Sequence, residues 1–196
     1  MKNPCPGLWL PDIQEQTKHL TSLTNNLITL SRMEEERTRL QMIDFPFSDV
    51  VEETVQSFQA LARTQNKTFE TLIQPMISLY GDEKSLTQLV SILLDNAMKY
   101  STPKGEISLR LEKAGNNVKL SVYNTAESIA REQLPHLFDR FYRTDKSRSS
   151  RTGGYGLGLC IAAAVVNTHK GKITATTQDE HSLLITVTLP LKTQGR

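Results

Sequence analysis

Apolar side chains recur at helical spacing near the start of the chain. Residues 13–41 contain no glycine or proline. Within them, steps of three or four residues separate the apolar positions Leu20, Leu23, Leu27, Leu30 and Met33. This spacing predicts a long helix with one narrow apolar seam, close to the period of a coiled coil. Because the rest of the helix is polar, we expect the seam to pack against a partner, either the chain's own domain or another helix.

Four later segments also carry apolar residues at helical spacing. They are residues 49–63, 82–101, 131–138 and 156–168. Pro46 separates the first of them from the seam helix, and Ser48 stands at its expected N-cap. Asp82 stands at the expected N-cap of the next segment, whose apolar face is broad. The pattern predicts four helices, and the one at 131–138 is short.

Alternating apolar and polar residues predict strands. The alternating positions of a first hairpin are Ile107, Leu109, Leu111, Val118, Leu120 and Val122. Gly115 and Asn116 lie between its two arms and are typical turn residues. Residues 68–73 predict another strand, and residues 172–177 and 183–189 predict a second hairpin. Because helices and hairpins do not alternate strictly, we expect an α+β fold whose layered sheet carries helices on one face.

The overall composition excludes several classes of protein. The 196 residues include 23 basic and 21 acidic side chains, a net charge of +2, which argues against a broad nucleic-acid surface. Cys5 and Cys160 are too few for a disulfide framework or a metal cluster, which indicates a reducing compartment. No apolar run approaches the about 20 residues that cross a bilayer, and no signal peptide is visible, so we expect no membrane contact by this chain.

A polar row lies beside the apolar face of the segment 82–101. Given the helical repeat, Asn96 and Lys99 project together, and Tyr100 borders the apolar face. An amide oxygen suits Mg²⁺, a lysine meets phosphate as a point charge, and an aromatic ring can lie against a base. An ordinary surface asparagine and lysine at a helix end would have the same pattern, so this segment alone does not decide between the two.

A glycine-rich segment precedes the helix at 156–168. Gly153, Gly154, Gly156 and Gly158 are four glycines within six residues. Backbone N–H groups at such a loop and helix start can hold phosphate oxygens. The polar residues upstream do not fit a dinucleotide-binding strand, loop and helix. A plain flexible loop is the alternative.

Residues 139–151, just before these glycines, are locally basic. They hold four arginines and one lysine against two aspartates. Such a cationic flap can close over a polyphosphate. A solvated basic loop is the alternative.

Together these motifs resemble the ATP-binding catalytic domain of bacterial sensor histidine kinases, in the superfamily of gyrase, Hsp90 and MutL. LLDNAMKYS at 93–101 is similar to the asparagine box of that family. LFDRFYRTDKSR at 137–148 is similar to its phenylalanine box and lid, and GGYGLGL at 153–159 to its glycine box. KHLTSLTNNLITLSRMEE at 18–35 is similar to the second helix of its dimerisation hairpin.

The resemblance implies an architecture and a division of the chain. The architecture is a two-layer sandwich, with a mixed five-stranded sheet covered by three helices and an extended N-terminal helix before it. Apart from the resemblance, the three prolines within residues 1–12 already predict a disordered lead-in there. Residues 13–43 would be part of the dimerisation helix, and residues 44–196 the ATP-binding catalytic domain.

The resemblance also implies a role for individual residues. Asn96 would hold Mg²⁺, Lys99 a phosphate, and Tyr100 the base or ribose of ATP. Arg143 and Arg148 would approach the phosphates, which the amides of Gly156 and Gly158 would surround, while Phe138 and Phe141 would anchor the lid. The whole implied ATP site is Asn96, Lys99, Tyr100, Asn124, Ile129, Arg143, Arg148, Gly154, Gly156, Leu157, Gly158 and Leu159.

Two departures from the family pattern bear on activity. Ile92 stands where hydrolytic relatives have a glutamate that activates water, which favours phosphoryl transfer over hydrolysis. Asn124 stands where the family has an aspartate that accepts a hydrogen bond from the adenine amino group, so we expect a weaker bond. Ala126 and Ser128 replace glycines of the same segment, and each would cost about 1–2 kcal/mol if its φ were positive.

The sequence contains four histidines, the residue type that accepts phosphate in this family. His19, His136, His169 and His181 do not stand in the family's phosphoacceptor motif, and we expect all four at the surface or at helix ends. We therefore expect a Mg-ATP-dependent histidine kinase fragment with no catalytic residue of its own to assign, whose acceptor histidine lies outside this chain. Its partners would be the acceptor helix of a homodimeric kinase and a response regulator. It would be the cytoplasmic portion of a membrane-bound bacterial sensor. The alternatives are a degenerate nucleotide-binding scaffold, and a serine kinase or ATPase of the same superfamily.

Overall fold

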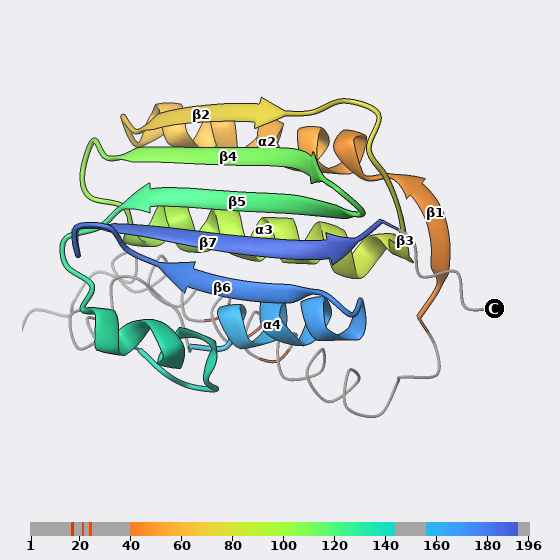
Figure 1. Ribbon diagram of the computed structural model, residues 1–196. Helices are drawn as coiled ribbons and strands as arrows, with labels where there is room; N and C mark the ends of the chain where they lie inside the picture. The colour runs from red at the N-terminus through yellow and green to blue at the C-terminus, as the bar shows by residue number, and fades with distance from the viewer. Residues whose placement is uncertain (1–16, 18–20, 22–23, 25–39, 144–155, 192–196) are drawn as a thin grey trace, which may run out of the picture.

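The computed structural model of the protein describes residues 40–143 and 156–191, together with Thr17, Thr21 and Thr24. Their main element is a five-stranded sheet of order β2-β4-β5-β7-β6 (Figure 1). β2 pairs with β4 in parallel, and the other three pairings are antiparallel. The strands are β2 (Thr68–Ile73), β4 (Glu106–Ala114), β5 (Asn117–Thr125), β6 (Lys172–Thr176) and β7 (Ser182–Pro190). The predicted mixed sheet and both predicted hairpins are confirmed.

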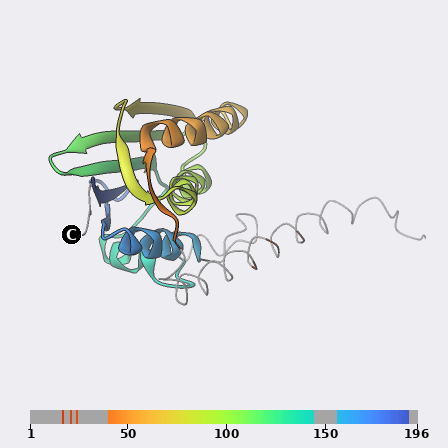
Figure 2. The same cartoon turned by 90° about the vertical axis from the view of Figure 1, so that its right-hand side faces the viewer.

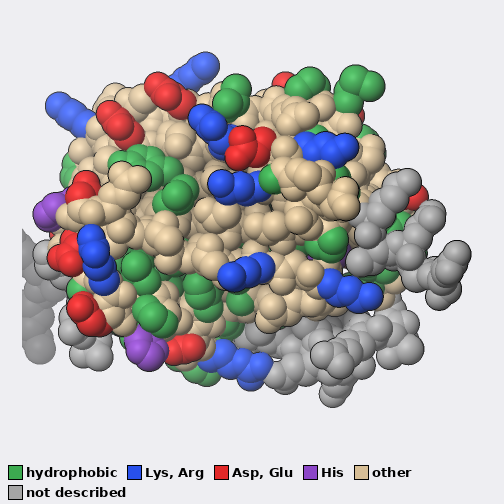
Figure 3. All heavy atoms as spheres, in the orientation of Figure 1, with side chains coloured by type: hydrophobic (Ala, Val, Ile, Leu, Met, Phe, Trp, Pro, Cys, Tyr) green, Lys and Arg blue, Asp and Glu red, His purple; other side chains and the backbone are tan. Residues whose placement is uncertain are grey.

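Three α-helices cover one face of this sheet (Figure 2). They are α2 (Phe47–Thr64), α3 (Glu83–Tyr100) and α4 (Gly158–Thr168). Alternate residues of the central strand β5 point toward them, and Val118, Leu120 and Val122 are at most 2% exposed. Burial of such aliphatic rows is the main favourable contribution to folding. The opposite face of the sheet is open to solvent and carries side chains of both charges (Figure 3). The predicted two-layer α+β fold is confirmed.

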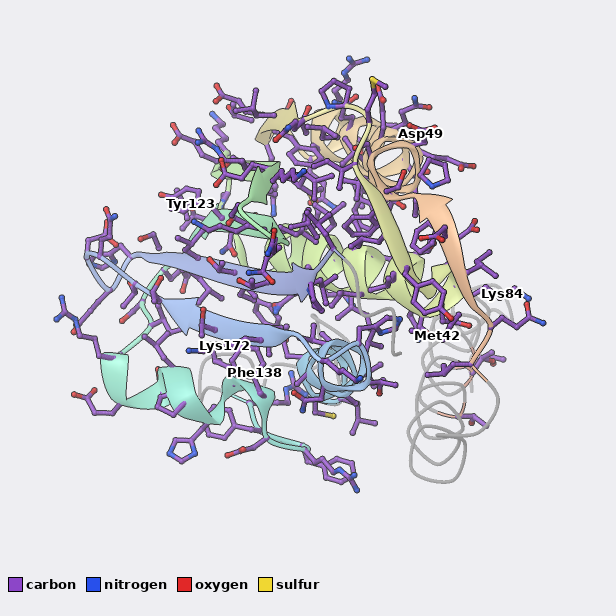
Figure 4. The ribbon with its side chains drawn as sticks, turned by 45° about the vertical axis from the view of Figure 1, so that its right-hand side comes forward. Met42, Asp49, Lys84, Tyr123, Phe138 and Lys172 are labelled. Carbon is purple, nitrogen blue, oxygen red and sulfur yellow. The ribbon has the colours of Figure 1, made fainter. Side chains whose placement is uncertain are left out.

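A second, two-stranded sheet lies beside the start of α3 and does not follow from the apolar pattern. β1 (Met42–Pro46) pairs antiparallel with β3 (Ser78–Asp82), so Met42 lies opposite Asp82. Figure 4 shows Met42 at the same end of the molecule as Lys84, in the first turn of α3. The helix expected over 13–43 therefore ends before Met42, because backbone pairing with β3 holds this part of the chain extended.

One of the two predicted helix caps is wrong and the other is confirmed. α2 begins one residue before Ser48, and the Ser48 hydroxyl makes tertiary contacts instead: it donates to Gln74 O at 2.7 Å and accepts from Ile77 N at 3.0 Å. At α3, Asp82 Oδ1 accepts from Ser85 N at 2.8 Å, as an N-cap does.

The other predicted helices differ little from expectation. The short helix at 131–138 is a 3₁₀-helix, η2 (Arg131–Phe138), and α4 begins two residues after 156. The lead-in at 1–12, the apolar seam and the stretch 144–155 lie outside the described residues. Thr17, Thr21 and Thr24 are helical, and the Thr21 hydroxyl donates to Thr17 O at 2.9 Å. Among the described helices, none combines the length and the apolar character of a membrane span.

Candidate functional site

The polar row of α3 faces the start of α4. Ile92 lies one turn before Asn96 on this row, and its Cγ2 atom is 3.5 Å from where a Cβ atom on Gly158 would lie. Since residues four apart share one face of a helix, the half-buried Asn96 projects toward the same region. The structure thus brings the face of α3 that carries Ile92 and Asn96 next to Gly158 at the start of α4, although the two segments are far apart in the sequence.

The opposite side of α3 holds this row in position. Its buried residues are at most 3% exposed, and they are Leu86, Leu89, Val90, Leu93, Leu94, Ala97 and Met98. Replacing one such buried leucine by alanine typically costs about 2–5 kcal/mol. The polar row therefore stands on a rigid, well-packed helix.

Lys99 and Tyr100 lie at the end of the same helix. Lys99 is exposed, and its Nζ atom is 2.7 Å from Asp95 Oδ2, one turn back. Exposed ion pairs of this kind contribute only about 0–1 kcal/mol. The ammonium group can therefore leave Asp95 for a stronger anion at little cost. Tyr100 is half-buried and is the last residue of α3.

Asn124 lies at the end of β5, beneath the helical layer. It continues the inward-facing row of that strand and is 3% exposed. Its Nδ2 atom donates to Thr125 O at 2.8 Å, which orients the side chain. The amide oxygen is the acceptor of the group, and an amino group of a ligand could donate to it.

The segment after Asn124 is unstrained, although alanine and serine stand where the family has glycines. Neither Ala126 nor Ser128 is among the residues with positive φ. The backbone is tied to the β6–β7 turn, because Ala126 N donates to His181 O at 2.7 Å and Ile129 N to Glu180 O at 2.8 Å. Ile129 is 6% exposed. The cost of about 1–2 kcal/mol that a positive φ would impose on Ala126 or Ser128 therefore does not arise.

Gly156 makes a close backbone contact with the phenylalanine segment. Its φ is +71°, and its carbonyl accepts from Phe141 N at 3.0 Å. A Cβ atom here would lie 2.7 Å from Tyr142 O, so only glycine fits without a shift. The glycine and phenylalanine segments are thus joined through their backbones. Gly154 lies outside the described residues.

The N-terminus of α4 has features that favour an anion. Its first turn contains no acidic residue, and Leu157 at the N-cap has no side chain that could accept from the first backbone N–H groups. Such an end favours negative charge, and phosphate oxygens in particular. Leu157 is 1% exposed, and Leu159 packs half-buried against the core, so the residues around these N–H groups are firmly held.

Cys160 lies in the first turn of α4 and is buried. Its thiol donates to Leu157 O at 3.1 Å. Burial raises the pKa of this thiol, although the charge of Arg140 opposes the effect. Cys160 therefore stays a neutral thiol that supports the turn and is not a nucleophile.

The structure describes only some of the residues that are expected to form or anchor the lid. Phe138, at the end of η2, is half-buried (Figure 4). Phe141 is 63% exposed, and its backbone N–H donates to Gly156 O. Its role as a lid anchor stays a prediction, because residues 144–155 lie outside the described part of the chain. Arg143 is half-buried, whereas Arg148 lies outside the described residues.

A divalent cation would have one protein ligand on this row. The described residues contain no group of three His, Cys, Asp or Glu side chains that could hold a metal. Asn96 offers a neutral amide oxygen on the face of α3 that lies against the N-terminus of α4, an end that favours anions. That donor set fits Mg²⁺, which takes few protein ligands and is completed by phosphate oxygens and water.

The pattern of these segments matches a known protein family. The family described as "Histidine kinase-, DNA gyrase B-, and HSP90-like ATPase" matches residues 81–193, which run from the end of β3 past the end of β7. The chain belongs to this family. Within the family, the resemblance to the ATP-binding catalytic domain of sensor histidine kinases is confirmed by the relatives that follow.

The chain is similar to named sensor kinases and to solved kinase structures. It is 32% identical to the sensor protein DltS of Streptococcus agalactiae, over 97% of this chain and 48% of DltS, so it spans about half of that protein. The mycobacterial sensor histidine kinase MprB is 26% identical, with a TM-score of 0.66, and the match covers 76% of this chain and 97% of that structure. The histidine kinase ThkA, solved in complex with the response regulator protein TrrA, has the same fold, with a TM-score of 0.75 at 20% identity, covering 100% of this chain and 55% of that one.

Two residues that hold the ends of α3 and α4 do not follow from the sequence pattern. His169, expected at the surface or at a helix end, follows α4 but is only 6% exposed. Lys67 has no motif around it, yet its Nζ atom donates to Met98 O at the end of α3. The sequence gives only a weak indication that His169 is buried. Gly81, just before the N-cap of α3, has no side chain and so leaves room for the His169 ring.

Proposed function

We propose that this chain binds Mg-ATP and transfers its γ-phosphoryl group to a histidine on an acceptor helix outside the chain. The proposal rests mainly on one observation: the face of α3 that carries Ile92 and Asn96 lies against the N-terminus of α4. That helix end has no acidic residue in its first turn, and its N-cap residue makes no side-chain hydrogen bond. A metal-binding amide and a phosphate-binding helix end at one position suit a triphosphate. Membership of an ATPase family supports the same substrate.

Each residue of the site has a distinct task in this proposal. The amide oxygen of Asn96 holds Mg²⁺, which neutralises phosphate charge. Lys99 exchanges Asp95 for a phosphate oxygen, and the N–H groups from Gly156 to Gly158 bind the others. Arg143, Arg148 and Gly154 complete the phosphate side.

The base side of the site is less charged. Asn124 accepts from the adenine amino group through its amide oxygen, because its Nδ2 atom is already used by Thr125 O. Tyr100 lies against the base or ribose. Ile129, Leu157 and Leu159 supply the apolar wall that keeps water from these contacts.

The chemistry of the transfer is mainly positioning and charge neutralisation, as phosphoryl transfer generally requires. An imidazole nitrogen of the acceptor attacks the γ-phosphorus, the bond to the β,γ-bridging oxygen breaks, and ADP leaves. Ile92 has no proton-accepting group, so it cannot activate water in competition with the histidine. This supports phosphoryl transfer over hydrolysis.

The relatives support a proposal for the partners of the whole protein. The chain spans about half of DltS, and we infer that it is the cytoplasmic portion of a longer, membrane-anchored, homodimeric sensor. The segment before β1 would pair with the acceptor helix. The catalytic domain would begin at Met42 and not at 44, because β1 pairs with β3. ThkA was solved with a response regulator protein, which supports a regulator as the second acceptor.

One assay separates the proposal from a degenerate scaffold and from an ATPase. The chain is incubated with γ-³²P-labelled ATP, Mg²⁺ and a helical hairpin peptide that contains an acceptor histidine. We expect label on the peptide that is stable to base and labile to acid. Release of free phosphate without the peptide would indicate hydrolysis, base-labile label would indicate a serine kinase, and no reaction of bound ATP would indicate a scaffold.

A further inference from the structure

Lys67 links the segment after α2 to the last turn of α3. Its Nζ atom donates to Met98 O at 2.5 Å, to Ser101 Oγ at 2.6 Å and to Ser101 O at 3.4 Å. Met98 and Ser101 lie on either side of Lys99 and Tyr100 in the sequence. The last carbonyls of a helix have no partner within it and carry partial negative charge, so a cation there stabilises the final turn.

The Lys67 ammonium group is held by hydrogen bonds to the end of α3 and is not free in solvent. Burial lowers its pKa, because the charged form loses water. An ammonium group has three N–H donors, and three oxygens of the α3 end accept from this one. A lysine that only served solubility would keep its charged group in water.

A pair of threonines extends this link to β5. Thr102 Oγ1 and Thr125 Oγ1 are 3.0 Å apart, and Thr125 Oγ1 also accepts from Glu106 N at 3.1 Å. The carbonyl of Thr125 accepts from Asn124 Nδ2. A Cβ atom on Gly105 would collide with both threonine hydroxyls, so glycine is what lets them meet. The end of α3 is thereby joined to Asn124 by consecutive short contacts.

We propose that Lys67, Thr102 and Thr125 form a brace that sets the separation between the last turn of α3 and Asn124. The brace would hold Lys99 and Tyr100 on one side of the nucleotide and Asn124 on the other. This inference rests on the proposed function, which assigns those three residues to ATP. The brace residues are positioning residues, since they act on ATP only through the groups that they hold. A displacement of about 1 Å in such groups is enough to weaken binding strongly.

The first test compares three lysine variants of the full 196-residue chain. Lys67→Met keeps the aliphatic stem and removes the ammonium group, whereas Lys67→Arg keeps a charged donor. Lys84→Met, at the exposed first turn of the same helix, is the matched control. Calorimetry with Mg-ATP should give a Kd raised on the order of tenfold in Lys67→Met. Lys67→Arg should recover much of the affinity, and Lys84→Met should match the wild type.

A second pair of variants keeps the test decisive if Lys67→Met fails to fold. Thr125→Val has nearly the shape of threonine without the hydroxyl, and Thr125→Ser retains the hydroxyl. We expect Thr125→Val to weaken Mg-ATP binding several-fold, and Thr125→Ser to bind nearly as well as the wild type.

Thermal unfolding midpoints, measured in parallel, separate positioning from stability. Lower midpoints in Lys67→Met and Thr125→Val, with a wild-type Kd for Mg-ATP, would overturn the brace and leave the proposed function intact. No Mg-ATP binding by the wild-type chain would contradict the proposed function itself. A raised Kd under conditions where the variant is fully folded supports the brace.

Discussion

The backbone N–H of Asp82 donates to Nε2 of the buried His169 at 3.0 Å and ties the start of α3 to the end of α4. Because Nε2 accepts this bond, the proton of the neutral ring lies on Nδ1, which donates to Val165 O at 2.8 Å. A Cβ atom on Gly81 would lie 2.9 Å from the ring. The two helices that frame the proposed nucleotide site therefore meet at a closely packed, fully hydrogen-bonded junction.

Replacing His169 by phenylalanine should lower the free energy of unfolding by about 1–3 kcal/mol. The ring keeps much of its volume, but the buried N–H of Asp82 loses its acceptor. Urea unfolding at neutral pH measures the change. His136→Phe serves as the control, because His136 is exposed and its contact with Asp139 lies at the surface. Equal losses in the two variants would contradict the structural role of His169.

The Asp82 carboxyl should make stability depend on pH. Burial raises its pKa, but the hydrogen bonds that it accepts from Ser85 and from Gln41 N outweigh burial and leave the pKa below its ordinary value. A carboxyl with a lowered pKa in the folded state stabilises the protein above the unfolded pKa. That contribution is lost as pH falls through the folded pKa.

The Asp82→Asn variant tests this dependence. The difference in unfolding free energy between wild type and variant should be largest at neutral pH and should shrink below about pH 4. Denaturant unfolding across this range measures it. A difference that stays constant with pH would mean that the charge of Asp82 contributes nothing.

Gly156→Ala should damage the nucleotide site more than a matched glycine replacement elsewhere. Gly156 and Gly115 both have positive φ, but only Gly156 has a neighbour, Tyr142 O, in the way of a Cβ atom. Gly115→Ala should therefore cost about 1 kcal/mol of stability and leave Mg-ATP affinity unchanged. Gly156→Ala should cost more and also raise the Kd for Mg-ATP, as calorimetry would detect. Identical behaviour of the two variants would argue against the close contact.

Asn124→Asp, which restores the family's aspartate, should destabilise this chain. The buried side chain donates from Nδ2 to Thr125 O, and a carboxylate in its place would face that carbonyl without a proton to donate. Burial of an unpaired acceptor costs about 1–3 kcal/mol. Thermal or urea unfolding at neutral pH measures the loss. A more stable variant would show that the carbonyl contact is unimportant.

The strands and helices could be predicted where the apolar period is long and regular. The alternation from Ile107 to Val122 predicts the β4–β5 hairpin, and the broad apolar face of α3 predicts a buried helix. β1 and β3 did not follow, because each has five residues and the burial of β1 does not alternate. Their formation depends on pairing with each other, which no local pattern encodes.

Site residues on short motifs could be predicted, but the residues that support them could not. Asn96 and the Gly156–Gly158 segment stand out by residue type and spacing. Lys67 acts through Met98, 31 positions away, Thr125 through Thr102, 23 positions away, and His169 through Asp82, 87 positions away. Ser48 illustrates the same limit, since a typical N-cap residue was used for tertiary contacts with Gln74 and Ile77. Only the folded arrangement reveals such long-range partners.

The most direct test of the account is a calorimetric titration of Mg-ATP into the wild-type chain and into Asn96→Ala. Asn116→Ala, in the exposed β4–β5 turn, is the control. We predict one binding site in the wild type, competition by ADP, and an affinity for Mg-ATP reduced at least about tenfold in Asn96→Ala alone. Absence of heat at millimolar Mg-ATP, or an unchanged affinity in Asn96→Ala, would contradict the assignment of a Mg-ATP site between α3 and α4.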